Sequence, residues 1–534
     1  MNYDALYNPY PSRRSTVYAK NGMVATSQSL AAQAGLAILR RGGNAVDAAV
    51  ATAACLTVVE PTSNGIGGDA FALVWMNDRL HGLNASGPAP MALSLDTLLG
   101  KGLKELPTNG WLPITVPGAP SAWAELVSRF GKLSLAEVLA PAIEYAESGY
   151  PVSPIISRQW QLGFQRFSAA PGPEFRHWFE TFAPDGHAPK AGELWRSPGH
   201  AATLRAIANS NAADFYQGEL AQKIDAFAQE HGGCLRKSDL AAYRPEWVEP
   251  IHVNYRGYDV WEIPPNGHGL VTLIALNILK GMAFDAKESV ETYHKQIEAI
   301  KLAFADGLKY ITDARQMKVS VADLLSDAYA DERRKLIGSQ ALTPAAGSPS
   351  KGGTVYLATA DSEGNMVSYI QSNYMGFGSG LVVPGTGIAL HNRGCNFSLD
   401  PAHDNALAPG KKPYHTIIPG FLTKDGQAVG PFGVMGGFVQ PQGHLQMVMN
   451  SVDFALNPQA SLDAPRWQWT KDKTVEVEHL FPEALAEALT RKGHNIVRPA
   501  SNLAMGRGQI IWRDEHGVLA GGTEPRTDGA VAAW

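Results

Sequence analysis

The chain has 534 residues, of which 45% are apolar and 18% are charged, and its formal net charge is −5. This balance is typical of a folded globular protein and excludes a disordered or fibrous chain. The charges are spread along the sequence, without the basic stripe or lysine run of a protein that binds nucleic acid or an anionic membrane.

Cysteine usage and the N-terminus indicate a cytoplasmic protein. The three cysteines are widely spaced, which favours a reducing compartment over a disulfide framework or a zinc site. The first residues lack an apolar targeting stretch, and Arg13-Arg14 is followed by polar residues where a twin-arginine signal needs a hydrophobic run. The longest uncharged helical stretch, Ala48 to Val59, is too short to span a bilayer, so we expect no membrane partner.

The N-terminal region begins with two predicted helices. Ser29 to Arg41 has apolar residues at helical spacing and stops at a glycine pair. Asn44 can cap a second helix over Ala45 to Val59, which is nearly all small and apolar and should be buried between layers. The glycine-rich turn from Glu60 to Asp69 precedes a predicted strand over Ala70 to Met76. A turn that follows a helix and precedes a strand has the wrong order for a dinucleotide fingerprint, so a nucleotide site is not indicated.

Helical sequence dominates the middle of the chain. It runs from Pro120 to about Ile337 and is interrupted by a strand-like stretch from Pro250 to Pro264. The segment from Ala345 to Gly353 is built from alanine, glycine, serine, proline and one lysine, a composition typical of a loop. From Thr354 onward strands dominate, so the character of the sequence changes at this residue.

Thr354 begins a predicted β-hairpin. Thr354 to Ala360 alternates in the β manner, Asp361 to Asn365 is a turn sequence, and Met366 to Ser372 is the expected returning strand. Taken alone, Gly-Gly-Thr is more often a loop that meets a strand than a catalytic segment. The pattern nevertheless places Thr354 at the end of a rigid hairpin, directly after a loop.

Thr354 is the candidate nucleophile. A threonine hydroxyl needs a base beside it, and the α-amino group of an N-terminal threonine, with a pKa of about 8, can be that base. The amine exists only if the bond between Gly353 and Thr354 is cut. Ser372, at the end of the returning strand, can hydrogen-bond Thr354, and the consecutive Gly436 and Gly437 can present backbone N–H groups to an oxyanion.

A dense polar cluster runs from His391 to Phe397. Within it, Arg393 can pair bidentately with a substrate carboxylate, or it can form a structural ion pair. A second cluster, Pro413 to Thr416, contains His415. The chain has neither the His-Glu-x-x-His motif of a metalloprotease nor the Gly-x-Ser-x-Gly elbow of a serine hydrolase.

Together these clusters resemble the gamma-glutamyltransferase family, from about Gly22 to Trp534, and most of all its bacterial glutathione hydrolase-like proenzymes. Two N-terminal segments carry part of the resemblance, Gly42 to Ala49 and Gly65 to Asp69. The C-terminal motifs that carry the rest are Thr354, Asp361, Gly364-Asn365, Phe377-Gly378-Ser379-Gly380, Gly387, Asn392, Phe397, Pro419, Gly436-Gly437 and Pro525-Arg526.

The resemblance implies an α+β N-terminal-nucleophile hydrolase with a four-layer αββα core, made as an inactive proenzyme that cuts itself between Gly353 and Thr354. The products would be a large chain of residues 1–353 and a small chain of residues 354–534, which share one core and stay associated. Thr354 would carry cleavage and acyl transfer, Ser372 would support it, and the amides of Gly436 and Gly437 would form the oxyanion hole. No metal, organic cofactor or nucleic acid is implied, and a dimer of αβ pairs is left open.

The departures from the family's pattern fall on substrate-binding positions. Ser86 stands where family members have the arginine that binds the glutamate α-carboxylate, and Asn396 replaces the aspartate that holds the α-amino group. The other departures are Tyr374 in place of a typical asparagine, Arg393 in place of glutamine, and His415-Thr416 in place of two serines. We expect a retained amide-cleaving machinery with an altered acyl pocket, in which Arg393 can supply a new carboxylate anchor.

Three functions follow, in order of preference. The first is a self-processing gamma-glutamyltransferase or glutathione hydrolase-like enzyme, which cleaves γ-glutamyl amides and passes the acyl group to water or an amine. The second is an amidohydrolase or acylase of the same superfamily with a different acyl substrate. The third is an unprocessed homologue that serves as a binding or structural protein.

Overall fold

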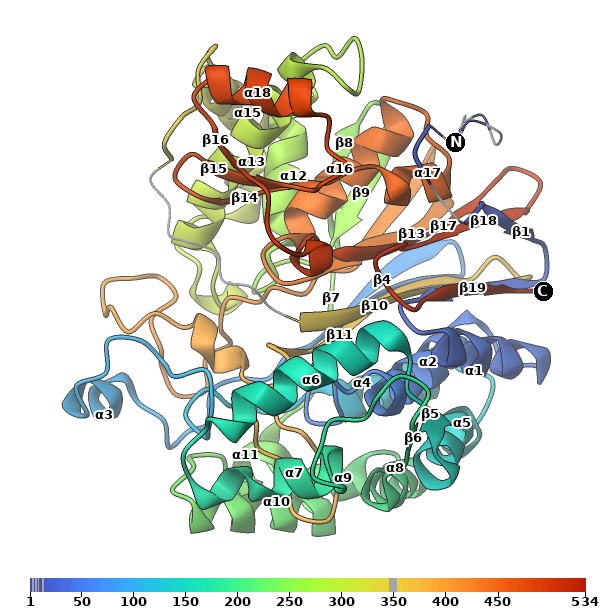
Figure 1. The fold of residues 1–534 in the computed structure, drawn as a ribbon, viewed down its shortest axis with the longest axis vertical. Coiled ribbons are helices and arrows are strands. Elements are labelled where there is room, and N and C mark those ends of the chain that lie inside the picture. The colour runs from blue at the N-terminus through green and yellow to red at the C-terminus, as the bar shows by residue number, and fades with distance from the viewer. Residues whose placement is uncertain (2–3, 5–6, 8, 12–13, 345–352) are drawn as a thin grey trace.

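The computed structural model describes the whole chain except residues 2–3, 5–6, 8, 12–13 and 345–352. The loop predicted over 345–353 therefore lies outside the described residues up to residue 352, and Gly353 begins a strand. Four layers are stacked in Figure 1, with helices on the outer face of each of two packed sheets. The architecture is an αββα sandwich.

Both large sheets are antiparallel throughout. The first has the order β1 (Val17–Ala19), β18 (Leu519–Thr523), β17 (Arg507–Arg513), β13 (Gln427–Met435), β12 (Gly420–Lys424), β9 (Tyr258–Glu262) and β8 (Ile251–Tyr255). The second has the order β19 (Ala530–Ala533), β2 (Gly22–Thr26), β10 (Gly353–Asp361), β11 (Met366–Tyr374), β3 (Asp69–Met76), β4 (Arg79–Ala85) and β7 (Glu246–Val248). Each sheet therefore combines strands from both sides of the bond between Gly353 and Thr354.

Helices cover the two outer faces (Figure 1). Those against the second sheet are α1 (Ser29–Arg40), α2 (Ala45–Val59), α4 (Ala119–Phe130), α5 (Leu135–Ser148), α6 (Pro154–Ser168), α7 (Arg176–Phe182), α8 (Pro198–Ser210), α9 (Ala213–Gln217), α10 (Glu219–Glu230) and α11 (Lys237–Ala242). Those against the first sheet are α12 (Gly269–Leu279), α13 (Val290–Tyr310), α15 (Asp327–Arg334), α16 (Gln440–Val452), α17 (Pro458–Asp463) and α18 (Glu483–Arg491), with the small sheet of β14 (Trp467–Lys471), β15 (Thr474–Val477) and β16 (Asn495–Val497). The short elements are α3 (Leu95–Gly100), α14 (Val321–Leu324), and the strand pair β5 (Tyr150–Pro151) and β6 (Leu194–Trp195).

The apolar core follows the layers. One cluster lies between the second sheet and its helices, one between the first sheet and its helices, and a third fills the space between the sheets with residues such as Phe71, Tyr356 and Ile511. A strand in a sheet that is covered on both faces is buried on both sides, and all nine residues of β11 are buried.

The elements predicted near the candidate nucleophile are confirmed. All of α2 is buried, and Asn44 caps it in a capping box with Asp47. The hairpin of β10 and β11 closes at Asp361, whose Oδ1 accepts from the backbone N–H groups of Glu363 and Asn365. The other oxygen of Asp361 accepts from the N–H of Ala45 at 2.9 Å, so the same carboxylate holds the turn and the start of α2.

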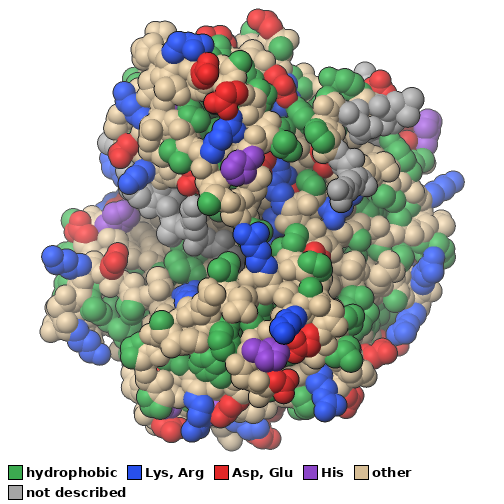
Figure 2. Space-filling view, in the orientation of Figure 1, with side chains coloured by type: hydrophobic (Ala, Val, Ile, Leu, Met, Phe, Trp, Pro, Cys, Tyr) green, Lys and Arg blue, Asp and Glu red, His purple; other side chains and the backbone are tan. Residues whose placement is uncertain are grey.

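The surface in Figure 2 shows acidic and basic side chains interspersed over the visible face, in keeping with the spread of charge along the sequence. Of the helices formed by the described residues, none is both long and apolar enough to cross a membrane.

Candidate active site

Thr354 and Ser372 come together at the open end of the hairpin. The two hydroxyl oxygens are 3.1 Å apart and both side chains are buried. The strand register is irregular here: Gly353 pairs with Tyr374 and Val355 pairs with Gln371, so the strand that carries Ser372 bulges opposite Thr354. The bulge is fixed by the N–H of Tyr374, which donates to Ser372 Oγ at 2.7 Å.

The Gly436-Gly437 pair forms the turn between β13 and α16. Its residues have φ values of +135° and +69°, in the left-handed region that favours glycine. A Cβ on Gly436 would lie 2.7 Å from Val439 Cγ1. Among the backbone hydrogen bonds of the described residues, none is donated by either glycine, so both N–H groups are available to an oxyanion. Because β10 packs on β13, this turn lies close to the hairpin that begins with Thr354.

A buried ionic cluster centres on Asp69 at the start of β3. Arg393 Nε donates to Asp69 Oδ2 at 3.1 Å, and His415 Nε2 lies 2.9 Å from the same oxygen. All three side chains are fully buried. Asp69 is the cross-strand partner of Ser372, so the cluster supports the strand end that carries the hydroxyl beside Thr354.

Electrostatics make Arg393 the counter-charge of Asp69. Burial and the charge of Arg393 lower the pKa of His415 to about 3, and burial also lowers the pKa of His391. The imidazole of His415 is therefore neutral near pH 7. Burial alone would raise the pKa of Asp69, but His391, the hydrogen bond from His415 and the charge of Arg393 together hold it well below its ordinary value.

Tyr374 and Thr416 complete this cluster. The guanidinium of Arg393 lies over the Tyr374 ring, 4.5 Å from its centroid, and Nη1 donates to Thr416 Oγ1 at 2.6 Å. Of the Arg393 nitrogens, Nη2 is buried without a hydrogen-bond partner among the described residues, and so is Oδ1 of Asp69. The structure therefore gives Arg393 the structural ion pair that the sequence allowed, and its role as a substrate anchor stays a prediction.

Ser86 and Asn396 have different hydrogen-bond partners. Ser86 is fully buried after β4, where its hydroxyl donates to Asn84 Oδ1 at 2.7 Å and lies 3.4 Å from Asn266 Oδ1. Asn396 donates to the carbonyl of Tyr414 at 3.0 Å and lines a cavity of about 410 Å³.

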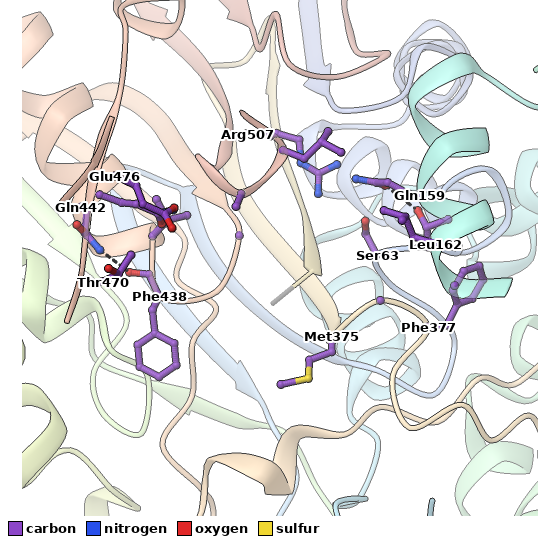
Figure 3. Close-up of a pocket in the computed structure, with 18 of the residues that line it drawn as sticks. Ser63, Gln159, Leu162, Met375, Phe377, Phe438, Gln442, Thr470, Glu476 and Arg507 are labelled. Atoms are coloured by element: carbon purple, nitrogen blue, oxygen red, sulfur yellow. Dashed lines mark hydrogen bonds between the residues drawn. The ribbon is translucent and has the colours of Figure 1, made fainter. Parts of the chain in front are cut away.

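A larger cavity of about 520 Å³ opens beside the hairpin end and the glycine turn (Figure 3). Met375 lines it, directly after the strand partner of Gly353, and so does Gly436. Phe438 lines this cavity and the smaller one that holds Asn396, so the two cavities adjoin at this ring. Thr354 itself is fully buried and lines neither cavity, so the larger cavity reaches the surroundings of the hairpin end and not the Thr354 hydroxyl.

Sequence reasoning missed two polar groups of this region. Asp69 was noted only as part of a glycine-rich motif, and Arg507 was not singled out, yet Asp69 anchors the ionic cluster and Arg507 lines the larger cavity. A charged residue directly after a run of glycines was the available signal for Asp69. Arg507 opens an ordinary strand, and its local sequence carries no such signal.

One further group has metal-binding residue types. Ligand atoms of His294, Glu298 and His494 lie within 4.8 Å of one another. Lys301 Nζ donates to Glu298 at 2.7 Å and lies 3.5 Å from His494 Nδ1, so an ammonium group already neutralises the carboxylate that a metal would need. We therefore interpret these residues as a buried polar network and not as a metal site.

Comparison with known proteins identifies the family. A sequence model described as Gamma-glutamyltranspeptidase matches residues 31–534. The chain belongs to this family. The glutathione hydrolase-like YwrD proenzyme of Bacillus subtilis (strain 168) is 37% identical over 527 residues, which cover 97% of this chain and 99% of the relative.

Two further similar proteins are described by other activities. The oxamate amidohydrolase proenzyme of Klebsiella pneumoniae is 35% identical over 534 residues, covering 97% of this chain and 100% of the relative. The crystal structure of a cephalosporin acylase from Bacillus halodurans matches with a TM-score of 0.96 and 66% identity, covering 100% of this chain and 99% of that one. The predicted family and the αββα fold of an N-terminal-nucleophile hydrolase are confirmed, and the chain is an enzyme of this hydrolase family.

Proposed function

We propose that the chain is a self-processing amide hydrolase of the acylase type, in which Thr354 is the nucleophile of both self-cleavage and acyl transfer. The observation that carries the proposal is the buried contact of 3.1 Å between the Thr354 and Ser372 hydroxyls at the end of the hairpin. The products of cleavage are a large chain of residues 1–353 and a small chain of residues 354–534. Its location in the cytoplasm stays a prediction.

Self-cleavage begins with attack of Thr354 Oγ1 on the carbonyl carbon of Gly353. The peptide C–N bond breaks, the α-amino group of Thr354 takes a proton, and water hydrolyses the resulting ester. In the mature enzyme this amine accepts the hydroxyl proton as Oγ1 attacks a substrate amide. The N–H groups of Gly436 and Gly437 stabilise the oxyanion, the proton passes to the leaving amine, and water or another amine releases the acyl group.

Three observations favour an acyl group other than γ-glutamyl. The position that holds the family's carboxylate-binding arginine is Ser86, whose hydroxyl is bonded to Asn84. Arg393 is paired with Asp69. The chain is 66% identical to a protein described as a cephalosporin acylase, against 31% for the glutathione hydrolase proenzyme of Escherichia coli (strain K12).

The second candidate is γ-glutamyl hydrolysis or transfer, favoured by the family itself and by the glutathione hydrolase-like relative at 37% identity. The two candidates differ in whether the α-amino and α-carboxylate groups of a glutamyl head are recognised. Two substrates separate them: γ-glutamyl-p-nitroanilide carries both groups, and glutaryl-p-nitroanilide keeps a terminal carboxylate and lacks the α-amino group.

The test is intact-mass spectrometry of the purified protein, before and after incubation with each anilide. We expect two chains, a new N-terminus at Thr354, and an acyl adduct on the small chain that forms more readily with the glutaryl compound. Thr354→Ala should remain one chain of 57.2 kDa, and Thr354→Ser should still be cut. A wild-type chain that stays uncut and takes up no acyl group would show the third, non-catalytic reading to be correct.

A further inference from the structure

Arg507 stands beside the proposed acyl-transfer centre. It is the first residue of β17, only 5% exposed, and its cross-strand partner is Met435, the residue before Gly436. It also lines the cavity of about 520 Å³. In Figure 3 its side chain extends toward the part of the cavity where Gln159 and Ser63 also lie.

The guanidinium of Arg507 has unused hydrogen-bonding capacity. A guanidinium carries five N–H donors, yet across the described part of the chain the Arg507 side chain makes no hydrogen bond, and its Nε is buried without a partner. The nearest carboxylate, Glu60 Oε1, is 3.7 Å from Nη1, beyond hydrogen-bond distance. Buried donors left in this state are costly, so the site is short of an acceptor.

A neighbouring arginine shows that this state is not general in the region. Arg466 is also buried, but its Nη2 donates to Glu524 Oε2 at 2.7 Å and its Nη1 donates to the carbonyl of Gly506 at 2.7 Å. Gly506 directly precedes Arg507. Two buried arginines therefore meet near Gly506: the donors of Arg466 are satisfied inside the protein, whereas Arg507 lines a cavity.

The surroundings of Arg507 favour an anion. Gln159 accepts at its Oε1 from Thr62 Oγ1 at 3.0 Å, which leaves its Nε2 donors to the cavity. The formal charges on the cavity wall are those of Arg166, Lys471, Arg507 and Glu476, so cations are in excess. Arg166 donates to the carbonyl of Gly376 at 3.2 Å, so it contributes positive charge to the cavity wall, and its donors are engaged by the protein.

Glu60 does not fully compensate this charge. Its carboxyl group is completely buried, its Oε2 accepts from Ser27 Oγ at 2.5 Å, and its Oε1 has no hydrogen-bond partner among the described residues. Burial raises the pKa of Glu60 to about 7 despite the opposing charge of Arg507. A substrate carboxylate can therefore pair with the guanidinium without competing against a fully ionised glutamate.

We infer that Arg507, assisted by Gln159, is a carboxylate-binding subsite for the substrate, next to the glycine turn that would hold the oxyanion. The inference rests on the proposed function, because it makes the subsite select among substrates of Thr354. The carboxylate belongs either to the far end of the acyl group or to the leaving amine. Both would use the same bidentate pairing with the guanidinium.

Paired substrates test the subsite and distinguish the two sources. Glutaryl-p-nitroanilide and pentanoyl-p-nitroanilide differ by a terminal carboxylate on an acyl chain of equal length. Pentanoyl-4-aminobenzoate and pentanoyl-anilide differ by a carboxylate on the leaving amine. In Arg507→Gln, kcat/KM should fall at least about 30-fold for one carboxylate-bearing substrate, the loss expected from a broken buried charge pair of about 2 kcal/mol, and less than about 3-fold for its uncharged partner.

Arg507→Lys and Arg166→Gln are the control variants. Lysine keeps the charge without the planar fork, so it should recover part of the selectivity, and Arg166→Gln changes a cation of the same wall whose donors are engaged. Cleavage into two chains and an unchanged melting temperature show that a variant is folded. Equal losses for the charged and uncharged partners of both pairs, or no loss at all, would overturn the inference.

A binding measurement separates the subsite from the catalytic proposal. Glutarate is titrated calorimetrically into the wild-type protein and into Arg507→Gln, with pentanoate as the singly charged comparison. Loss of glutarate binding in the variant supports the subsite even if no anilide is cleaved, a result that would count against the proposed function alone. Equal glutarate binding by both proteins refutes the subsite.

Discussion

Replacing Asp69 by asparagine should cost the protein a large part of its stability. The substitution keeps the size of the side chain and removes the charge opposite Arg393, which is fully buried and 3.1 Å away. Removing one partner of a buried ion pair costs about 3–5 kcal/mol, because the remaining charge is left uncompensated. The loss of unfolding free energy should lie near the upper end of this range, because His415 Nε2 also loses its contact of 2.9 Å with the charged carboxylate.

The assay is urea denaturation followed by fluorescence, compared among the wild type, Asp69→Asn and the double variant Asp69→Leu/Arg393→Met. The double variant removes both charges and fills the site with apolar groups, so it should lie closer to the wild type than the single variant does. The difference between wild type and Asp69→Asn should be constant from pH 5 to 8. The pKa of Asp69 is held well below its ordinary value, so its stabilisation is lost only as the pH falls below about 4. A single variant no less stable than the double variant would refute the reasoning.

Three further outcomes are expected. Gly436→Ala should slow self-cleavage and lower kcat by about 10²-fold, because its Cβ would meet Val439 at 2.7 Å in a turn with φ of +135°. Single-turnover kinetics measure the effect, and a normal kcat would exclude this turn as the oxyanion site. The wild type should lose about 3 kcal/mol of stability between pH 4.5 and 7, because the folded pKa of Glu60, about 7, lets the folded state bind more protons than the unfolded state in that window. Glu60→Gln should abolish this loss. Urea midpoints at pH 5 and 8 measure it, and the same change of midpoint with pH in the wild type and the variant counts against it. Asn44→Ala should lower the free energy of unfolding by about 1–2 kcal/mol, because it removes the cap of α2 and the hydrogen bond to the Phe130 carbonyl. Ser94→Ala, at the exposed cap of the short α3, should lower it less, and equal urea midpoints for the two variants would contradict this.

The parts of the fold predicted correctly from the sequence are those specified by nearby residues. The alternation after Thr354, the turn at Asp361 and the cap at Asn44 are all local signals, and the structure confirms each of them. The contact of Thr354 with Ser372 follows from the same hairpin, because 18 residues and one turn separate the two hydroxyls.

The pairings that define the site's electrostatics could not be predicted in this way. Asp69 and Arg393 are 324 residues apart in the chain. Arg507 starts a strand of the first sheet and Glu60 is the C-cap of helix α2, so only the tertiary packing brings them within 3.7 Å of each other. Whether an arginine is bonded internally or faces a cavity depends on such packing, which the local sequence does not encode. For that reason the sequence singled out Arg393 as a carboxylate anchor, whereas the structure pairs it with Asp69 and leaves donors open on Arg507.

The topology explains how a cut at Thr354 is compatible with an intact enzyme. β10 lies inside the second sheet, paired with β11 from Gly353 and with β2 from Leu357 onward, so hydrogen bonds on both edges hold the strand that would begin with the new N-terminus. β2 belongs to the segment before the cut and β11 to the segment after it. The first sheet is interleaved in the same way, with β9 and β8 continuing from β12. Separating the two chains would expose both sheets and the core between them, so the proposed cleavage would free the α-amino group of Thr354 without releasing the strand that positions it.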